Sequence, residues 1–178
     1  MRAISFGRVN VQDPGVPVRL GQSTLAANLD EAAQTLAVTS ASPFCTDLIP
    51  FKLDIDPTGD HEAVMVTGIA GTTFTVRRGI DGTTPIAHGS LAVVMADFPF
   101  AGWTLESVPG LTGRVYWGRH PITAGGAGVI HDFYENVDGS LHKNSDFMPG
   151  CGNPLNLTDF ATDAEVANEG IYITLWQK

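Results

Sequence analysis

Basic residues are scarce in this chain of 178 residues. Ten lysines and arginines stand against nineteen aspartates and glutamates, which gives a formal net charge of -9 at pH 7. Proteins that bind nucleic acid through its phosphates carry clustered Lys and Arg on one face. The shortage of positive charge argues against a nucleic-acid-binding protein, and we expect no nucleic acid among its partners.

Long apolar runs are also missing. The longest, Leu91–Ala96, has six residues, whereas a helix that spans a bilayer needs about 20. The first residues, MRAISFGRVNVQ, lack the apolar core of about 7 to 15 residues that a secretory signal contains. We therefore expect no membrane partner and no export, but assembly in the cytoplasm.

Cysteine is rare, and so are the motifs of catalysis. Cys45 and Cys151 are the two cysteines, and neither has a second Cys or a His at the spacing of a zinc site. The sequence contains no G-x-S-x-G and no H-E-x-x-H, the motifs that mark hydrolase nucleophiles and zinc proteases. We expect two reduced thiols, no cofactor, no catalytic residue and no enzymatic activity.

Acidic residues gather in the segment DIDPTGDHE. There Asp54, Asp56, Asp60 and Glu62 could offer calcium the oxygen ligands that it prefers. An EF-hand loop that starts at Asp54 needs a glutamate at its twelfth position, but Met65 stands there. We therefore interpret the segment as a solvated acidic turn between two strands, and we expect no metal.

Glycine and proline, in contrast, are plentiful. The 20 glycines and 11 prolines separate short runs of β-branched or alternating residues, a pattern that predicts strands joined by tight turns. In the first half the expected strands lie at 50–56, 62–68, 72–79 and 91–96. A hairpin turn is expected at Ala70–Gly71.

The composition changes near residue 98, where we place a domain boundary. Trp103, Trp117 and Trp176 all follow it and predict a separate core around large aromatic side chains. The residues TDAEVANEG, 162–170, fit a short capped helix but equally a hairpin that turns at 168–170. A capping-box spacing from Asn28 to Glu31 predicts one helical turn within 28–34.

The first 28 residues are rich in turn residues, and their apolar residues are spaced too irregularly for a helix. The segment contains three arginines, Arg2, Arg8 and Arg19, and one aspartate. Its net charge is therefore +2, while that of the rest of the chain is -11. We expect an extended arm, outside both cores, whose arginines bind a partner. The predicted fold is all-β, with two small β-sandwich or barrel-like domains, 29–98 and 99–178, preceded by this N-terminal arm, 1–28.

The stretch from Thr35 to Val94 carries the most informative motif. Its sequence RGIDGTTPIAHG contains Arg78, Gly79, Gly82, Thr83, Thr84, Ala87, His88 and Gly89. This stretch resembles a small β-module that recurs in structural proteins of tailed bacteriophages, among them tail fibre, minor tail and head-attached proteins. The resemblance covers about a third of the chain.

Elementary chemistry assigns structural roles to the same residues. Gly79 and Gly82 bracket a loop that can need positive φ. Thr83 and Thr84 can bond local backbone groups, and His88 can fasten the returning chain before the next strand. We therefore expect these residues to build a scaffold and to perform no reaction.

The resemblance implies a structural protein of the virion that assembles in the host cytoplasm. A tail fibre would continue into a repetitive shaft, but this sequence has no internal repeat, so we favour a capsid decoration or cement protein that binds the major capsid protein. The alternatives are an adaptor of the tail, neck or head spike and, from the aromatic second half, a carbohydrate-binding module on the virion. Proteins with this resemblance are commonly trimeric, and we expect a homotrimer.

Overall fold

The computed structural model describes residues 2–122, 126–134, 145–147 and 155–177 of the chain. Strands dominate these residues, and the helical elements among them are two short 3-10 helices, η1 (Thr46–Leu48) and η2 (Leu157–Asp159). The predicted all-β class is confirmed. No helix in the described ranges is long and apolar enough to cross a membrane.

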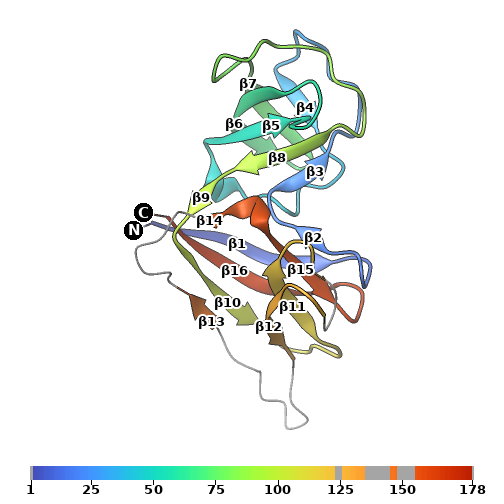
Figure 1. Ribbon diagram of the computed structural model, residues 1–178, viewed down its shortest axis with the longest axis vertical. Helices are drawn as coiled ribbons and strands as arrows, with labels where there is room; N and C mark the ends of the chain where they lie inside the picture. Colours follow the sequence, from blue (N-terminus) through green and yellow to red (C-terminus); the bar gives the residue numbers. More distant parts are fainter. Residues whose placement is uncertain (1, 123–125, 135–144, 148–154, 178) are drawn as a thin grey trace. The chain divides into compact units, whose positions relative to one another are not determined.

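The chain forms two compact units (Figure 1). The barrel unit is the continuous segment Gly21–Phe98, and the sandwich unit combines Met1–Leu20 with Pro99–Lys178. The chain thus leaves the sandwich unit after residue 20 and returns to it at residue 99. The return coincides with the boundary that the sequence suggests near residue 98, but the first 20 residues belong to the same unit as the second half.

Two four-stranded antiparallel sheets form the sandwich unit (Figure 1). The first has the order β1 (Arg2–Val11), β16 (Glu169–Gln177), β10 (Gly102–Ser107), β13 (Ser145–Phe147). The second has the order β12 (Val129–Phe133), β11 (Val115–Arg119), β15 (Phe160–Ala164), β2 (Val18–Arg19). A short pair of strands, β9 (Pro99–Phe100) and β14 (Leu155–Asn156), belongs to the same unit.

The core between these sheets is aromatic. Trp103 of β10, Trp117 of β11 and Phe160 of β15 are at most 2% exposed. The ring of Trp117 stacks on that of Phe160 with centroids 5.4 Å apart, and Trp103 meets both rings edge-on. Since β10 belongs to one sheet and β11 and β15 to the other, these rings join the sheets. Trp176 takes no part in this stack, because its neighbour Leu175 fills the inward position on β16.

The prediction of an N-terminal arm outside both cores is wrong. β1 pairs with β16 along its whole length, and Ile4, Val9 and Val11 are fully buried. The apolar spacing is irregular because the register shifts between Ser5 and Gly7, where Gly7 adopts φ +67. Such a bulge moves the inward-facing positions by one residue. The rest of the expected arm, residues 21–28, belongs to the barrel unit.

Neither of the two helices considered from the sequence forms. At 162–170 the structure has the hairpin: β15 ends at Ala164, β16 begins at Glu169, and Asn168 adopts φ +63 in the turn. At 28–34 the Asp30 carboxylate accepts a 2.9 Å bond from the N–H of Ala32 and closes a turn. Asp and Asn bond nearby backbone groups in turns as well as at helix ends, so the sequence signals were ambiguous.

Six antiparallel strands form the barrel unit (Figure 1). Their order is β3 (Gln22–Thr24), β8 (Val93–Asp97), β5 (Phe51–Ile55), β6 (Glu62–Ala70), β7 (Thr73–Arg77), β4 (Thr35–Ala37). The two edges of this sheet meet beyond β3 and β4, where Leu25 bridges Val38. The sheet therefore closes on itself, and the β6–β7 hairpin turns at Gly71 as predicted.

Candidate functional site

The segment RGIDGTTPIAHG, residues 78–89, connects β7 to β8 and is the candidate site because it carries the resemblance. Gly79 has φ +64 and Gly82 has φ +79, so both adopt the positive φ that the sequence suggested. A Cβ atom at Gly79 would lie 2.9 Å from Cδ of Pro85, whereas one at Gly82 would meet nothing within 4 Å. The backbone requires a glycine-like conformation at both positions, but the space is restricted at Gly79.

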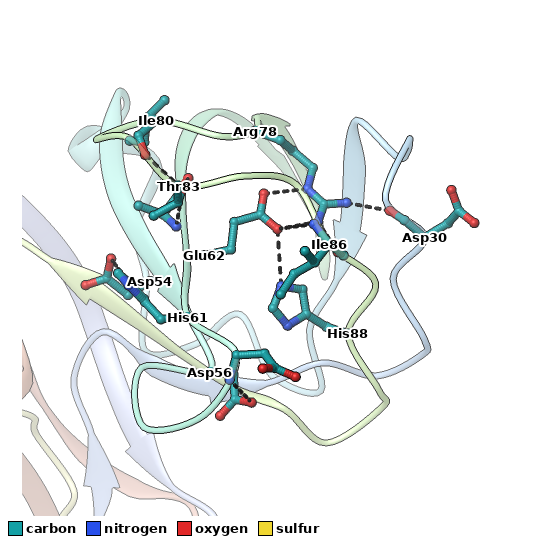
Figure 2. Close-up of polar contacts among 12 residues, drawn as sticks. Asp30, Asp54, Asp56, His61, Glu62, Arg78, Ile80, Thr83, Ile86 and His88 are labelled. Carbon is teal, nitrogen blue, oxygen red and sulfur yellow. Dashed lines mark hydrogen bonds and ion pairs between the residues drawn. The ribbon is translucent and has the colours of Figure 1, made fainter.

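A single buried carboxylate organises this connection (Figure 2). Glu62 of β6 is 0% exposed. Its Oε1 accepts a 2.8 Å bond from Arg78 Nε, and its Oε2 accepts bonds from Arg78 Nη2 and, at 3.2 Å each, from the Ile86 N–H and His88 Nε2. Two residues of the β7–β8 connection, Arg78 and His88, thus bind one side chain of strand β6. We call Glu62, Arg78 and His88 the Glu62 knot.

The Glu62 knot also holds a second connection of the barrel unit. Arg78 donates from Nη1 to the carbonyl of Asp30 and from Nη2, at 2.5 Å, to that of Ile86. The backbones of Leu29 and His88 exchange two hydrogen bonds of 2.9 Å. The loop before β4 and the loop before β8 are therefore fastened together.

The buried carboxylate of Glu62 is paired with the guanidinium of Arg78. Burial alone would raise the pKa of Glu62, but the bonds from Arg78, Ile86 and His88 outweigh it and hold the pKa below its ordinary value of 4.5. Glu62 is therefore ionised at neutral pH and neutralises Arg78. The side chains of Arg78 and His88 are 5% and 2% exposed, so the knot has almost no surface for a substrate to touch. Its geometry suits a structural role.

The two threonines of the motif behave differently. Thr83 Oγ1 donates to the carbonyl of Ile80 at 2.8 Å and accepts a 3.1 Å bond from the N–H of Ala63. It therefore ties the loop to β6 beside the knot (Figure 2). Thr84 is exposed.

The acidic turn does not collect its four carboxylates around one point. Glu62 belongs to the knot, Asp54 pairs with His61 at 3.1 Å, and Asp56 accepts a 3.2 Å bond from the N–H of Asp60. No group of three or more His, Cys, Asp or Glu among the described residues is arranged to hold a metal ion. The carboxylates of Asp54, Asp56 and Glu62 are each used in a local contact.

Lys52 forms ion pairs with three carboxylates of the same region, which sequence reasoning missed. Its Nζ lies 3.1 Å from Asp81, 3.5 Å from Asp54 and 3.6 Å from Asp97. Partial burial would lower the pKa of Lys52, but the three carboxylates outweigh this effect and raise it. The residues come from β5, β8 and the motif loop, and nothing in their sequence spacing indicates the contact.

The three arginines assigned to partner binding lie within the sandwich unit. Arg8 donates from Nη2 to the carbonyl of Asn168 at 2.9 Å, and Arg19 donates from Nε to that of Thr158. Arg19 is half-buried, whereas Arg2 and Arg8 are exposed on β1. Arg19 therefore stabilises its own unit, and partner binding by Arg2 and Arg8 stays a prediction.

Two carboxylates near the β15–β16 hairpin have structural roles that the sequence did not reveal. Glu165 accepts a 2.5 Å bond from the hydroxyl of Tyr116, and burial together with this bond raises the pKa of Tyr116 to about 12. Glu169 accepts bonds from the N–H and the hydroxyl of Thr112 at 2.5 and 2.8 Å. Glu165 fastens the hairpin to β11, and Glu169 fastens it to the segment that leads into β11.

No family model matches the chain, and no curated protein matches it. Functional inference therefore depends on the residues of this chain and their geometry.

Proposed function

We propose that this chain is a structural protein of a tailed-bacteriophage virion, and specifically a capsid decoration protein that binds the major capsid shell. The observation that carries the proposal is the Glu62 knot. The motif by which the chain resembles phage structural modules supplies Arg78 and His88 to a buried carboxylate and thereby builds a rigid scaffold. A motif whose side chains stabilise the fold is suited to a structural protein of a virus particle.

The shape of the elements supports a compact accessory component over a fibre. The longest strand in either unit has ten residues, and no strand pattern repeats within the residues that the structure describes. A fibre shaft requires such repetition. The module occurs in tail proteins too, so an adaptor of the tail, neck or head spike is the second candidate.

Oligomerisation is part of the proposal. Copies with a net charge of -9 repel one another, so a homotrimer needs contacts that are apolar or that use the exposed arginines of β1. Sedimentation of the purified chain in low salt would give three times the monomer mass of 18.9 kDa. A monomer under these conditions would contradict the free trimer.

Reconstitution on particles tests the capsid assignment. Particles made without this gene product would be incubated with the purified chain and separated from unbound protein by sedimentation. Binding that saturates and raises the temperature at which the shell opens supports decoration. Binding only to isolated tails would support the second candidate, and absence of binding to heads and tails would contradict both.

A further inference from the structure

The outer face of the first sheet of the sandwich unit carries aromatic side chains that the core does not use. Along β16 the odd-numbered residues from 171 to 175 are at most 1% exposed, so Tyr172, Thr174 and Trp176 project from the opposite face. Tyr172 is 43% exposed and Trp176 is half-buried. We call this surface the aromatic face.

The strands on either side of β16 place only small side chains next to Trp176. The residues paired with Thr174 and Trp176 on β1 and β10 are all small: Ala3, Ser5, Gly102 and Thr104. Trp176 Nε1 donates a 3.0 Å hydrogen bond to Thr104 Oγ1, which holds the indole toward β10, where Gly102 offers no side chain to displace it. Thr104 therefore fixes the orientation of the indole, and part of the Trp176 side chain is exposed to solvent.

Polar groups of both kinds flank Tyr172. Its partners across the sheet are Arg8 on β1 and Glu106 on β10, and both are exposed. Arg8 uses Nη2 for the carbonyl of Asn168 and keeps further N–H donors, while Glu106 offers acceptors. Arg8, Tyr172 and Glu106 together carry no net charge, although the chain as a whole is strongly acidic.

These features select one class of ligand. A pyranose ring has an apolar face that stacks on an aromatic ring and hydroxyl groups that need both donors and acceptors. Nucleic acid bases stack as well, but a chain with net charge -9 repels phosphate groups, and it repels anionic glycans for the same reason. We propose that the aromatic face binds a neutral oligosaccharide.

The spacing of the rings indicates a chain of sugars. Tyr172 and Trp176 are four residues apart on β16, so their Cα atoms are about 13 Å apart, which exceeds the width of a single pyranose ring. A monosaccharide can therefore reach one ring but not both. The carbohydrate hypothesis drawn from the sequence concerned Tyr116 and Trp117, which are 4% and 0% exposed, so a different pair of residues supplies the surface.

Tryptophan emission of the full chain tests the proposal directly. Trp103 and Trp117 are at most 2% exposed, so quenching of the emission by acrylamide reports on Trp176. The chain would be titrated with cellohexaose, chitohexaose, maltohexaose and xylohexaose, with glucose as the monosaccharide control. We expect at least one hexasaccharide to protect the emission from quenching and glucose to have little effect.

Substitutions on the aromatic face distinguish stacking on Tyr172 from non-specific binding. Tyr172→Ala should weaken binding about tenfold, because it removes one stacking ring, and Tyr172→Phe should retain it. Glu106→Ala, also at an exposed position, should weaken binding to a smaller degree. Val16→Ala is the matched control, because Val16 is 61% exposed in the same unit but lies off this sheet.

Three results would overturn the proposal. The first is no protection by any of the four hexasaccharides at millimolar concentration. The second is binding that Tyr172→Ala and Glu106→Ala leave unchanged. The third is an oligomer that Tyr172→Ala dissociates, with no sugar bound, which would make the face a contact between copies. All three are measured on the isolated chain, so they are independent of whether the chain belongs to a virion.

Discussion

Glu62 can remain ionised inside the barrel unit because Arg78 and His88 meet it there. Glu62→Gln keeps the shape of the side chain but leaves the buried Arg78 without a counter-charge. Loss of one partner of a buried ion pair costs about 3–5 kcal/mol, and we expect the free energy of unfolding to fall by about that much. Urea denaturation followed by circular dichroism measures the change.

A matched control lies two residues away. Asp60 is exposed, and Asp60→Asn should change the free energy of unfolding by no more than about 0.5 kcal/mol. If Glu62→Gln proves as mild as Asp60→Asn, the knot does not stabilise the barrel unit in the way described above.

The same carboxylate predicts how stability depends on pH. The pKa of Glu62 is lower in the folded chain than its ordinary value of 4.5, so the unfolded chain binds the proton more tightly. The stabilisation is therefore complete above the unfolded pKa and is lost as the pH falls through the folded pKa. Denaturation of the wild type and of Glu62→Gln between about pH 7 and pH 2 should show their difference shrinking below about pH 4. A difference that stays constant over this range contradicts the assignment.

The two glycines of the motif should differ in sensitivity. Gly79→Ala and Gly82→Ala both place a Cβ at positive φ, which costs about 1–2 kcal/mol. Only the Cβ at Gly79 approaches Pro85 and the Thr83 carbonyl, at 2.9 and 3.2 Å. We expect Gly79→Ala to lower the melting temperature further than Gly82→Ala does, and equal losses would mean that the loop moves aside freely.

At the scale of elements, β1 is the strand whose role differs most from expectation. Ile4→Ala removes a fully buried side chain, and such a truncation costs about 2–5 kcal/mol. All three tryptophans lie in the sandwich unit, so their emission during urea denaturation reports this loss selectively. Ser5→Ala, at an exposed neighbour, is the control and should have little effect. A silent Ile4→Ala would restore the hypothesis of a detachable arm.

Strict alternation decided which strands could be predicted from the sequence. β5, β7 and β8 were expected close to their observed bounds, because their more buried and more exposed residues alternate between turns. β1 was missed because the bulge at Gly7 breaks its alternation. The β15–β16 hairpin could not be chosen over a helix, since Asn168 and its neighbours suit both.

The candidate site was predicted only in part, for a related reason. The positive φ of Gly79 and Gly82 follows from their residue type. Glu62, in contrast, stands among acidic residues that suggest a solvated turn, and its partners Arg78 and His88 follow 16 and 26 residues later. A contact across a closed barrel leaves no periodic signal in the sequence.

At the scale of the whole molecule, the barrel unit is a continuous segment set between two parts of the sandwich unit. The boundary near residue 98 could be suggested from composition, but the crossing at residue 20 could not. That crossing follows from the pairing of β1 with β16, which joins the two ends of the chain. The positive charge of the N-terminal segment therefore belongs to a folded sheet, and any partner that it binds meets a rigid surface.

Counting copies of the chain in purified virions tests the proposed function most directly. If the proposal holds, quantitative mass spectrometry of those virions would compare this chain with the major capsid protein. A decoration protein that follows the symmetry of the shell predicts a fixed ratio with on the order of hundreds of copies per particle. About a dozen copies or fewer would contradict capsid decoration and favour the tail or a vertex, and the absence of the chain from particles would contradict a virion protein altogether.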